Sequence, residues 1–330
     1  MEPPETELLH AQAEGLEIRP SQEILSVLLK GQIDALECVK SALPQIEQAA
    51  LLAAKALASG KKIAYAAAGS SALMALADAL ELPGTFGIES RQIAILMAGG
   101  MESLSRLNGY PEDNIDQALH DVANAKLGNG DCLIAVSASG TTPYVVNAAL
   151  EARARGTAVI AIANNPDAPL LNNCDVAILI ATPAELIAGS TRMGAATAQK
   201  VALNMLSTLM AIDLGHTHDG QMVNFSADNE KLRARAIHMV VTIGKCSEKT
   251  ARLLLEKSGG SVKLAILMAR GANCADDAMT YLDRADQNLR LALSLLREDQ
   301  PSPINTGACS PYKLTPQLAK TGDRNEKNLD

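Results

Sequence analysis

The chain has 330 residues, of which 48% are hydrophobic and 2% aromatic, contains no tryptophan and carries a net charge of −8. This size allows one large α/β domain with a small second unit, and the shortage of aromatic rings argues against recognition by stacking on bases or sugars. The acidic balance argues against nucleic-acid and anionic-membrane partners, and no apolar run approaches the length of a membrane span. Six scattered cysteines and the lack of a signal-peptide pattern predict a cytoplasmic protein with reduced thiols.

Polar, proline-containing residues 1–20 are predicted to form a flexible arm. A helical pattern follows over 21–59, and short apolar runs then alternate with helical stretches. Continuous apolar runs of this kind are typical of strands that are covered on both faces of a parallel sheet. The predicted strands span 62–67, 92–98, 132–137, 158–163 and 175–180.

Helices that cross over between such strands predict a three-layer, doubly wound α/β fold, whose ligands bind beyond the carboxyl ends of the strands. Residues 21–243 are assigned to this sheet domain. Residues 244–298 contain short helical patterns separated by glycines, which predict a small helical module. The polar residues 299–330 are predicted to be disordered.

The turn after the third predicted strand carries hydroxyl side chains in a run of small residues, and an amphipathic stretch begins just after it. A helix N-terminus stabilises an anion, because its first N–H groups lack partners and carry partial positive charge. The turn therefore fits either a phosphate cradle built without lysine or an ordinary Ser/Thr helix cap. Its hydroxyl residues are Ser137, Ser139, Thr141 and Thr142.

A second strand-to-helix turn has the same character. Gly69 allows a tight turn, and Ser70 and Ser71 offer hydroxyl groups where a helix begins. Two such turns at the ends of parallel strands in one domain are placed to surround a small phosphorylated ligand such as a sugar phosphate. Two capped helices remain the alternative.

The two turns resemble those of the sugar isomerase (SIS) superfamily, and longer segments resemble one branch of it, the bacterial N-acetylmuramic acid 6-phosphate etherases. The similarity runs from about residue 60 to about residue 297. The resemblance implies an SIS-type sugar-phosphate-binding domain that cleaves the D-lactyl ether of the sugar by elimination and hydration, in amino-sugar and peptidoglycan recycling. It implies no metal and no organic cofactor. The matching segments include 78–87, 97–100, 137–144, 189–193, 197–208 and 229–236.

By collinear position, the resemblance places the family's two catalytic glutamates on Glu81 and Glu112. Elimination needs an acid that protonates the departing ether oxygen and a base that takes a proton next to a carbonyl, and carboxyl groups suit both roles. Glu81 is expected to be the acid for lactate departure and then to activate water, with Glu112 as the second acid–base group. A solvated carboxylate at a helix end is the alternative for Glu81, and an ordinary polar loop is the alternative for Glu112.

The run Ser190-Thr191-Arg192 also matches the family. The Arg192 guanidinium suits a lactyl carboxylate or a phosphate, with a structural salt bridge as the alternative. His216 and His218 are minor candidates for proton transfer. Their i,i+2 spacing without a third ligand is weak evidence for a metal site, so none is predicted.

The chain departs from the family pattern at the sites of phosphate contact. Ala66 and Ala67 stand in a first turn that is richer in glycine in the family, Thr141 replaces an arginine, and Gly194 replaces a lysine. The family's opening motif survives at most as Thr6-Glu7. Because these changes remove glycine and cationic contacts, two alternatives stay open: another phosphosugar isomerase, and a non-catalytic sugar-phosphate-binding regulator.

Helices that are apolar on more than one face predict a homodimer. The superfamily resemblance implies that paired subunits complete each other's sites. The expected partners are therefore a phosphorylated amino sugar and a second copy of the chain, with no nucleic acid and no membrane.

Overall fold

Five parallel strands form the central sheet of the computed structural model, which describes residues 5–105, 110–225, 227 and 229–299. Their order is β2-β1-β3-β4-β5, so the chain winds outward from β1 in both directions. This order confirms the predicted doubly wound α/β fold. The strands are β1 Ile63–Ala67, β2 Ile93–Met97, β3 Cys132–Val136, β4 Ala158–Ala163 and β5 Val176–Leu179.

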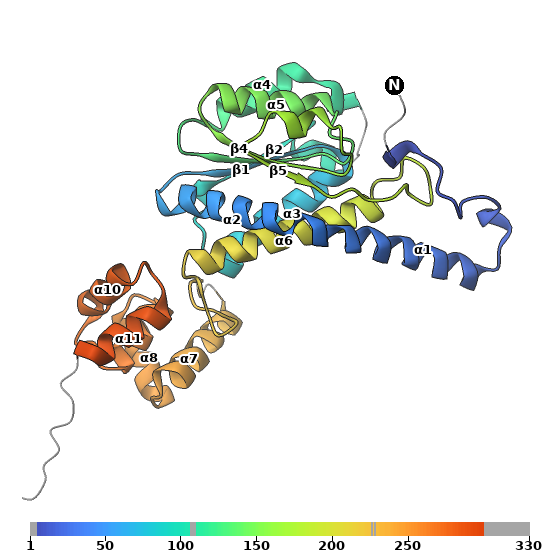
Figure 1. Cartoon of the computed structure of the whole chain (residues 1–330). Helices are drawn as coiled ribbons and strands as arrows, with labels where there is room; N and C mark the ends of the chain where they lie inside the picture. The colour runs from blue at the N-terminus through green and yellow to red at the C-terminus, as the bar shows by residue number, and fades with distance from the viewer. Residues whose placement is uncertain (1–4, 106–109, 226, 228, 300–330) are drawn as a thin grey trace, which may run out of the picture.

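Helices cover both faces of the sheet and give three layers (Figure 1). Alternate strand residues point to opposite faces, so Ile63 and Tyr65 belong to one hydrophobic cluster while Ala64 and Ala66 belong to another. Burial on both faces explains why the strands read as continuous apolar runs. One face carries α4 Ile115–Asn124 and α5 Pro143–Ala154, and the other carries α2 Leu43–Ala58, α3 Gly69–Phe86 and α6 Gly194–Asp213, with α1 Ser21–Glu37 packed along α6.

All the strands end at one edge of the sheet, called here the carboxyl edge. Ala67 at the end of β1 pairs with Met97 of β2 and with Val136 of β3, and Val136 pairs in turn with Ile162 of β4. The turns that follow β1 and β3 therefore lie side by side. The opposite edge, where the strands begin, is called the amino edge.

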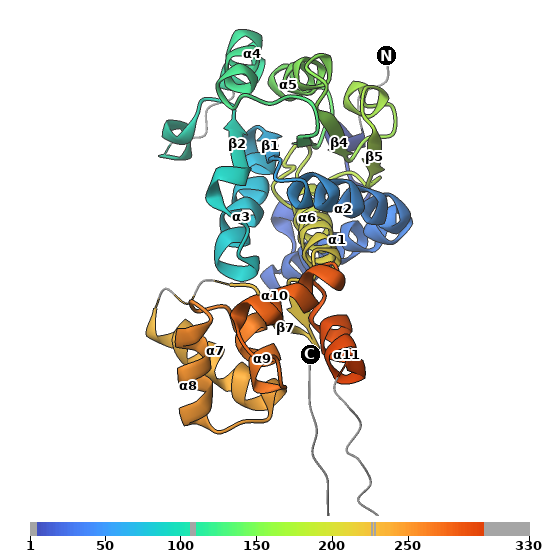
Figure 2. The same cartoon turned by 90° about the vertical axis from the view of Figure 1, so that its left-hand side faces the viewer.

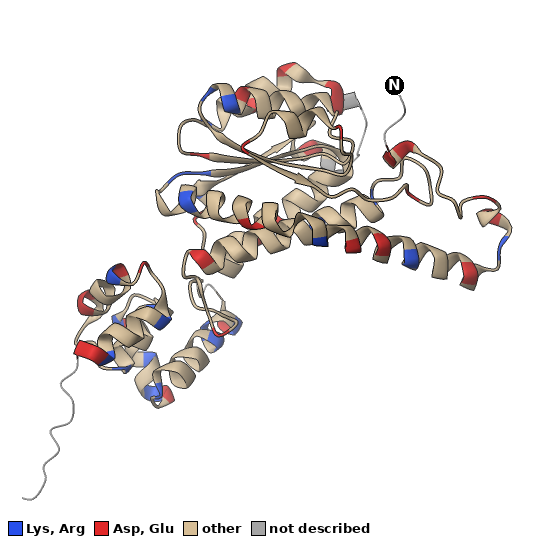
Figure 3. Cartoon of the chain, viewed as in Figure 1, with Lys and Arg blue, Asp and Glu red and all other residues tan. Residues whose placement is uncertain are grey.

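The C-terminal helices form a separate module with its own hydrophobic core. Helix α7 lies inside the range predicted for the sheet domain, yet its buried residues Ala236, Met239 and Val240 belong to the core of the module, against α8 and α9. Many lysine and arginine residues lie on this module (Figure 3). Its helices are α7 Glu230–Gly244, α8 Glu248–Lys257, α9 Val262–Ala269, α10 Ala275–Arg284 and α11 Leu289–Asp299.

The module is attached at the amino edge, beyond the end of α6 (Figure 2). The buried Lys263 ammonium donates to the carbonyl oxygens of Gly215, at 3.5 Å, and of Gln287, at 3.3 Å. The Asn224 side-chain amide donates to the carbonyl oxygen of Phe86, at 3.1 Å. A short hairpin of β6 Thr217–His218 and β7 Gln221–Met222 completes this junction.

The N-terminal residues contain two short 3-10 turns, Glu5–Glu7 and Leu16–Ile18. Thr6 is fully buried, which differs from the flexible arm predicted for residues 1–20. The arm lies beside the loop that precedes α6 (Figure 1). Within the described ranges, no helix is both long and apolar enough to cross a bilayer.

Candidate functional site

The first turn lies between β1 and α3, at the carboxyl edge. Gly69 has φ +54°, whereas the flanking alanines are absent from the non-glycine residues with positive φ. The alanines of this turn therefore need no left-handed backbone conformation. Helix α3 begins after Ala68 without a side-chain cap, and Ser71 is buried while Ser70 is half-buried.

The second turn lies between β3 and α5, and its hydroxyl groups bond to one another. The Ser137 hydroxyl lies 2.9 Å from the Thr142 hydroxyl and accepts the Gly140 N–H at 3.0 Å. Both the N–H and the hydroxyl of Thr141 donate to the Ser139 hydroxyl, at 3.2 and 3.0 Å. Helix α5 begins at Pro143 without a side-chain cap, so these hydroxyls shape the turn and do not act as the predicted helix cap.

Gly140 allows this turn to pack closely against the chain that follows β4. Its φ is +67°, and a Cβ atom added there would lie only 2.2 Å from the Cβ of Ala168. The Leu170 N–H also donates to the Gly140 carbonyl oxygen, at 3.1 Å. The hydroxyl turn is therefore held closely against the segment of residues 168–170.

Glu112 reaches the first turn from the 3-10 helix Tyr110–Asp113. A Cβ atom added to Gly69 would lie 2.7 Å from Oε1 of Glu112, so this carboxyl group lies directly against the start of α3. Burial raises the pKa of the Glu112 carboxyl, and the charge of Asp113 raises it further. A half-buried carboxyl group with a raised pKa is thus positioned beside a helix N-terminus.

The third predicted segment, Ser190 to Arg192, lies in the loop between β5 and α6, also at the carboxyl edge. Ser190 and Thr191 are half-buried and Arg192 is exposed. Within the described residues Arg192 forms no salt bridge, so its predicted structural alternative is not observed. The Glu185 carboxylate caps the start of α6 by accepting the N–H groups of Gly194, at 3.0 Å, and Ala195, at 2.8 Å.

Glu81 is separated from this group within the chain. It lies in the last turns of α3, close to the amino edge, and its side chain is exposed. The eleven positions between Ser70 and Glu81 correspond to roughly 16 Å along a helix axis. The structure of one chain therefore brings Glu112 and the hydroxyl turns together at the carboxyl edge and leaves Glu81 at the other end of α3.

Comparison with known proteins identifies the family of the chain. Residues 33–164 match the SIS domain family. The N-acetylmuramic acid 6-phosphate etherase of Symbiobacterium thermophilum is 44% identical over 229 residues, which are 69% of this chain and 76% of that protein. The etherase of Deinococcus radiodurans is 36% identical over 292 residues, which are 88% of this chain and 96% of that protein. The chain belongs to the N-acetylmuramic acid 6-phosphate etherase family.

Among solved structures, a phosphoheptose isomerase from Francisella tularensis is similar with a TM-score of 0.47 and 20% identity, covering 59% of this chain and 100% of that chain.

The structure of this chain also explains one departure from the etherase pattern, the glycine at position 194. A Cβ atom at Gly194 would lie 2.9 Å from the Cβ of Ala35 in α1 and 3.2 Å from Oε2 of Glu185. The space next to position 194 is therefore filled by α1 and by the carboxylate that caps α6.

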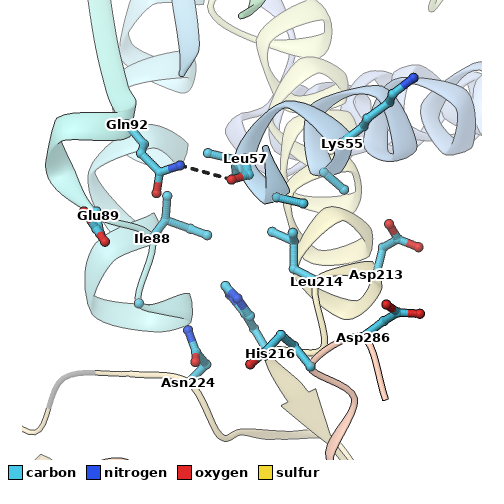
Figure 4. A pocket seen from close by; sticks show the side chains of 14 residues that line it. Lys55, Leu57, Ile88, Glu89, Gln92, Asp213, Leu214, His216, Asn224 and Asp286 are labelled. Carbon is cyan, nitrogen blue, oxygen red and sulfur yellow. Dashed lines mark hydrogen bonds between the residues drawn. The ribbon is translucent and has the colours of Figure 1, made fainter. Parts of the chain in front are cut away.

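A cavity of about 560 Å³ lies at the amino edge, between the ends of α2, α3 and α6 and the C-terminal module (Figure 4). His216 lines it, and burial followed by the charge of Lys263 lowers the His216 pKa to about 4. Burial also lowers the pKa of Lys263 to about 8. No hydroxyl turn opens into this cavity, and His218 pairs with Asp219 in the adjoining hairpin, 3.5 Å away.

In the part of the chain that the structure describes, no group of three His, Cys, Asp or Glu side chains is arranged to hold an ion.

Sequence reasoning missed two polar residues at the carboxyl edge, Glu185 and Asn165. Asn165 is the second residue after the end of β4 and is buried. Its position is a usable signal, because polar residues at the carboxyl ends of parallel strands face the ligand side of such sheets.

Proposed function

We propose that this chain cleaves the D-lactyl ether of N-acetylmuramic acid 6-phosphate, giving N-acetylglucosamine 6-phosphate and D-lactate in amino-sugar and peptidoglycan recycling. Membership of the etherase family supports this substrate. The observation that carries the proposal is the position of Glu112, whose carboxyl group lies against Gly69 at the start of α3. An acid–base group and two hydroxyl turns therefore share one edge of the sheet.

The 6-phosphate is assigned to the hydroxyl turns. Ser70, Ser139 and Thr141 are at least partly accessible, and the first N–H groups of α3 and α5 have no side-chain cap. Two uncapped helix N-termini with hydroxyl donors stabilise a phosphate without a lysine. Ser71, Ser137 and Thr142 support the same turns, and Ser190, Thr191 and Arg192 are assigned to the lactyl carboxylate.

The reaction takes place on the open-chain sugar. A base removes the C2 proton, which is acidic because the C1 aldehyde is adjacent, and the C3–O bond breaks as an acid protonates the departing lactate oxygen. Water then adds to C3 of the unsaturated aldehyde, and C2 regains a proton. Glu112 suits the proton transfers, because a carboxyl group with a raised pKa both takes and returns protons closer to neutral pH.

Glu81 joins this scheme only across a subunit boundary, since α3 separates it from Glu112. We therefore assign the chain to a homodimer with shared sites. Apolar side chains of α2 and α6 support this assignment, because Leu43, Met205 and Ile212 are exposed and line a hollow of about 600 Å³ between these helices. We also assign the chain to the cytoplasm, where free cysteines persist, and the described cysteines are all free.

The test is lactate release from N-acetylmuramic acid 6-phosphate by the wild-type chain, by Glu81→Ala, by Glu112→Ala, and by a dissociated and reassociated equal mixture of the two variants. If each variant is inactive and the glutamates come from different subunits, the mixture regains about a quarter of wild-type activity. Half of the reassembled dimers are then mixed, and each mixed dimer has one intact site.

Each of the other outcomes contradicts one part of the proposal. An inactive mixture places both glutamates in one subunit's site, and full activity of Glu81→Ala removes Glu81 from the mechanism. Sugar-phosphate binding by the wild-type chain without lactate release contradicts the etherase. In that case, aldose–ketose interconversion identifies an isomerase, and binding without any turnover identifies a regulator.

A further inference from the structure

The N-terminal arm forms part of the carboxyl edge. Thr6 is fully buried, and its carbonyl oxygen accepts the N–H of Gly189 at 3.0 Å. Its N–H donates to Oδ1 of Asn165 at 3.4 Å, and its hydroxyl oxygen accepts from Nδ2 of Asn165 at 3.3 Å. The Glu7 carboxylate lies against Gly189, since a Cβ atom added there would be 2.9 Å from its Oε2. The arm thus contacts both the end of β4 and the loop that carries Arg192.

Asn165 connects this arm to the hydroxyl turn. Its Nδ2 also donates to the carbonyl oxygen of Ala138, at 2.9 Å, within the turn that follows β3. The same carbonyl oxygen accepts the N–H of Asn164 at 3.0 Å. One buried side chain therefore bridges the turn assigned to the phosphate and the arm that holds the Gly189 loop.

The loop of residues 186–193 makes few other hydrogen bonds in the described structure. In the described structure, the remaining hydrogen bonds of residues 186–193 run within the loop or to the first turn of α6. The bond from Gly189 to Thr6 is thus the hydrogen bond that joins this loop to a distant part of the chain. This bond therefore restrains the position of the loop relative to Thr6 and, through Thr6, to Asn165.

We propose that Thr6 and Asn165 are positioning residues, which hold the loop of residues 189–192 at a fixed distance from the turn of residues 137–142. This proposal rests on the proposed function, because it assigns the two segments to opposite ends of one substrate. A substrate that carries two anionic groups binds tightly only when its two sites are held at the matching separation. Thr6 and Asn165 fix that separation without touching the substrate.

Three variants test the proposal. Thr6→Val removes the hydroxyl with little change of shape, Thr6→Ser keeps it, and Asn165→Leu removes the whole bridge. We expect KM to rise about fivefold in Thr6→Val and about tenfold or more in Asn165→Leu, with kcat changed less than KM, and Thr6→Ser to behave like the wild type.

Thr157→Val is the matched control. Thr157 is also buried, and its hydroxyl donates to the carbonyl oxygen of Gly128, at 3.1 Å, but it precedes β4 at the amino edge. The variant Thr157→Val loses a comparable hydrogen bond and is expected to leave KM unchanged. An equal rise of KM in Thr157→Val would show a general loss of stability and overturn the proposal.

Hydrogen–deuterium exchange of residues 186–193 gives a readout that does not depend on activity. Faster exchange in Thr6→Val and Asn165→Leu, but not in Thr157→Val, supports the positioning role even if the wild-type chain releases no lactate. Unchanged exchange in Thr6→Val and in a folded Asn165→Leu overturns it, whatever the enzyme assay shows.

Discussion

The two edges of the sheet both contain partly buried titratable groups, but their hydrogen-bond partners differ. At the amino edge, the ammonium of Lys263 donates to the backbone carbonyls of Gly215 and Gln287. The bond to Gly215 joins α9 of the C-terminal module to the segment that follows α6. At the carboxyl edge, Glu112 lies beside a helix start that no side chain caps.

The proposed site at the carboxyl edge differs from the amino edge in more than a cavity and a shifted pKa. The amino edge has both, in a cavity of about 560 Å³ beside a histidine whose pKa falls to about 4. Beside it, the ammonium of Lys263 bonds to the Gly215 carbonyl and so joins two parts of the chain. The carboxyl edge has free N–H groups, accessible hydroxyls and a carboxyl group in one place, which is the set that binding and proton transfer require.

The largest expected effect compares one titratable residue from each edge. Glu112→Gln keeps the size of the side chain but removes its proton transfer, so lactate release is expected to fall about 10³-fold with sugar-phosphate binding retained. His216→Gln, in the amino-edge cavity, is expected to lower lactate release by less than about twofold. Steady-state kinetics of both purified variants check this, and a similar loss in the two would abolish the distinction between the edges.

The next effect concerns the junction at the amino edge. The lowered pKa means that folded Lys263 loses its proton near pH 8, whereas the unfolded chain keeps it up to about pH 10.5. The unfolded state therefore binds more protons in this window, and the free energy of unfolding gains up to roughly 3 kcal/mol as pH rises through it. Lys263→Met has no titrating group at this position, so its free energy of unfolding is expected to lack this rise with pH.

Urea unfolding at pH 7.5, 9 and 10.5 measures this contribution as the difference in pH dependence between the wild type and Lys263→Met. The exposed Lys257→Met is the control, because its lysine has ordinary access to water. Parallel pH profiles for the wild type and Lys263→Met would show that Lys263 is not buried as the junction requires.

The smallest expected effect tests the acid–base role that is proposed for Glu112. Its pKa is raised first by burial and then by the charge of Asp113. A protonated Glu112 cannot take the C2 proton, so kcat/KM is expected to fall as pH drops through this pKa. Asp113→Asn lowers that pKa and extends activity to lower pH, by about a few tenths of a unit. The pH dependence of kcat/KM measures the shift, and Asp116→Asn, on the exposed first turn of α4, is expected to leave it in place. A shift to higher pH in Asp113→Asn would contradict this acid–base assignment.

Local patterns predicted much of the fold. The five apolar runs became the five strands, because a strand buried on both faces must be apolar at every position. The turns of small hydroxyl residues after β1 and β3 were also found from the sequence, as was the family. Whether those hydroxyls cap a helix was left open, and the structure answers it, since neither helix has a side-chain cap.

Other features needed contacts between distant segments. Helix α7 was assigned to the sheet domain because its sequence pattern gives its length but not the core against which it packs. Glu81 was paired with Glu112 by its collinear position in the family pattern, yet within one chain the length of α3 carries it to the other edge. The N-terminal residues were predicted to be flexible from their polarity, although Thr6 is buried by its contacts with Asn165 and Gly189.

By itself, the sequence determined the strands, the edge where their polar turns meet and the family, because periodicity and turn chemistry act over a few neighbouring residues. Only the tertiary structure decided which groups lie together at the carboxyl edge. Thr6 and Asn165 are 159 positions apart in the chain and yet hydrogen-bonded, and Glu112 lies against Gly69 from a different strand connection. Such pairs form because parallel strands align their ends in space, and no local pattern encodes which distant residue arrives there.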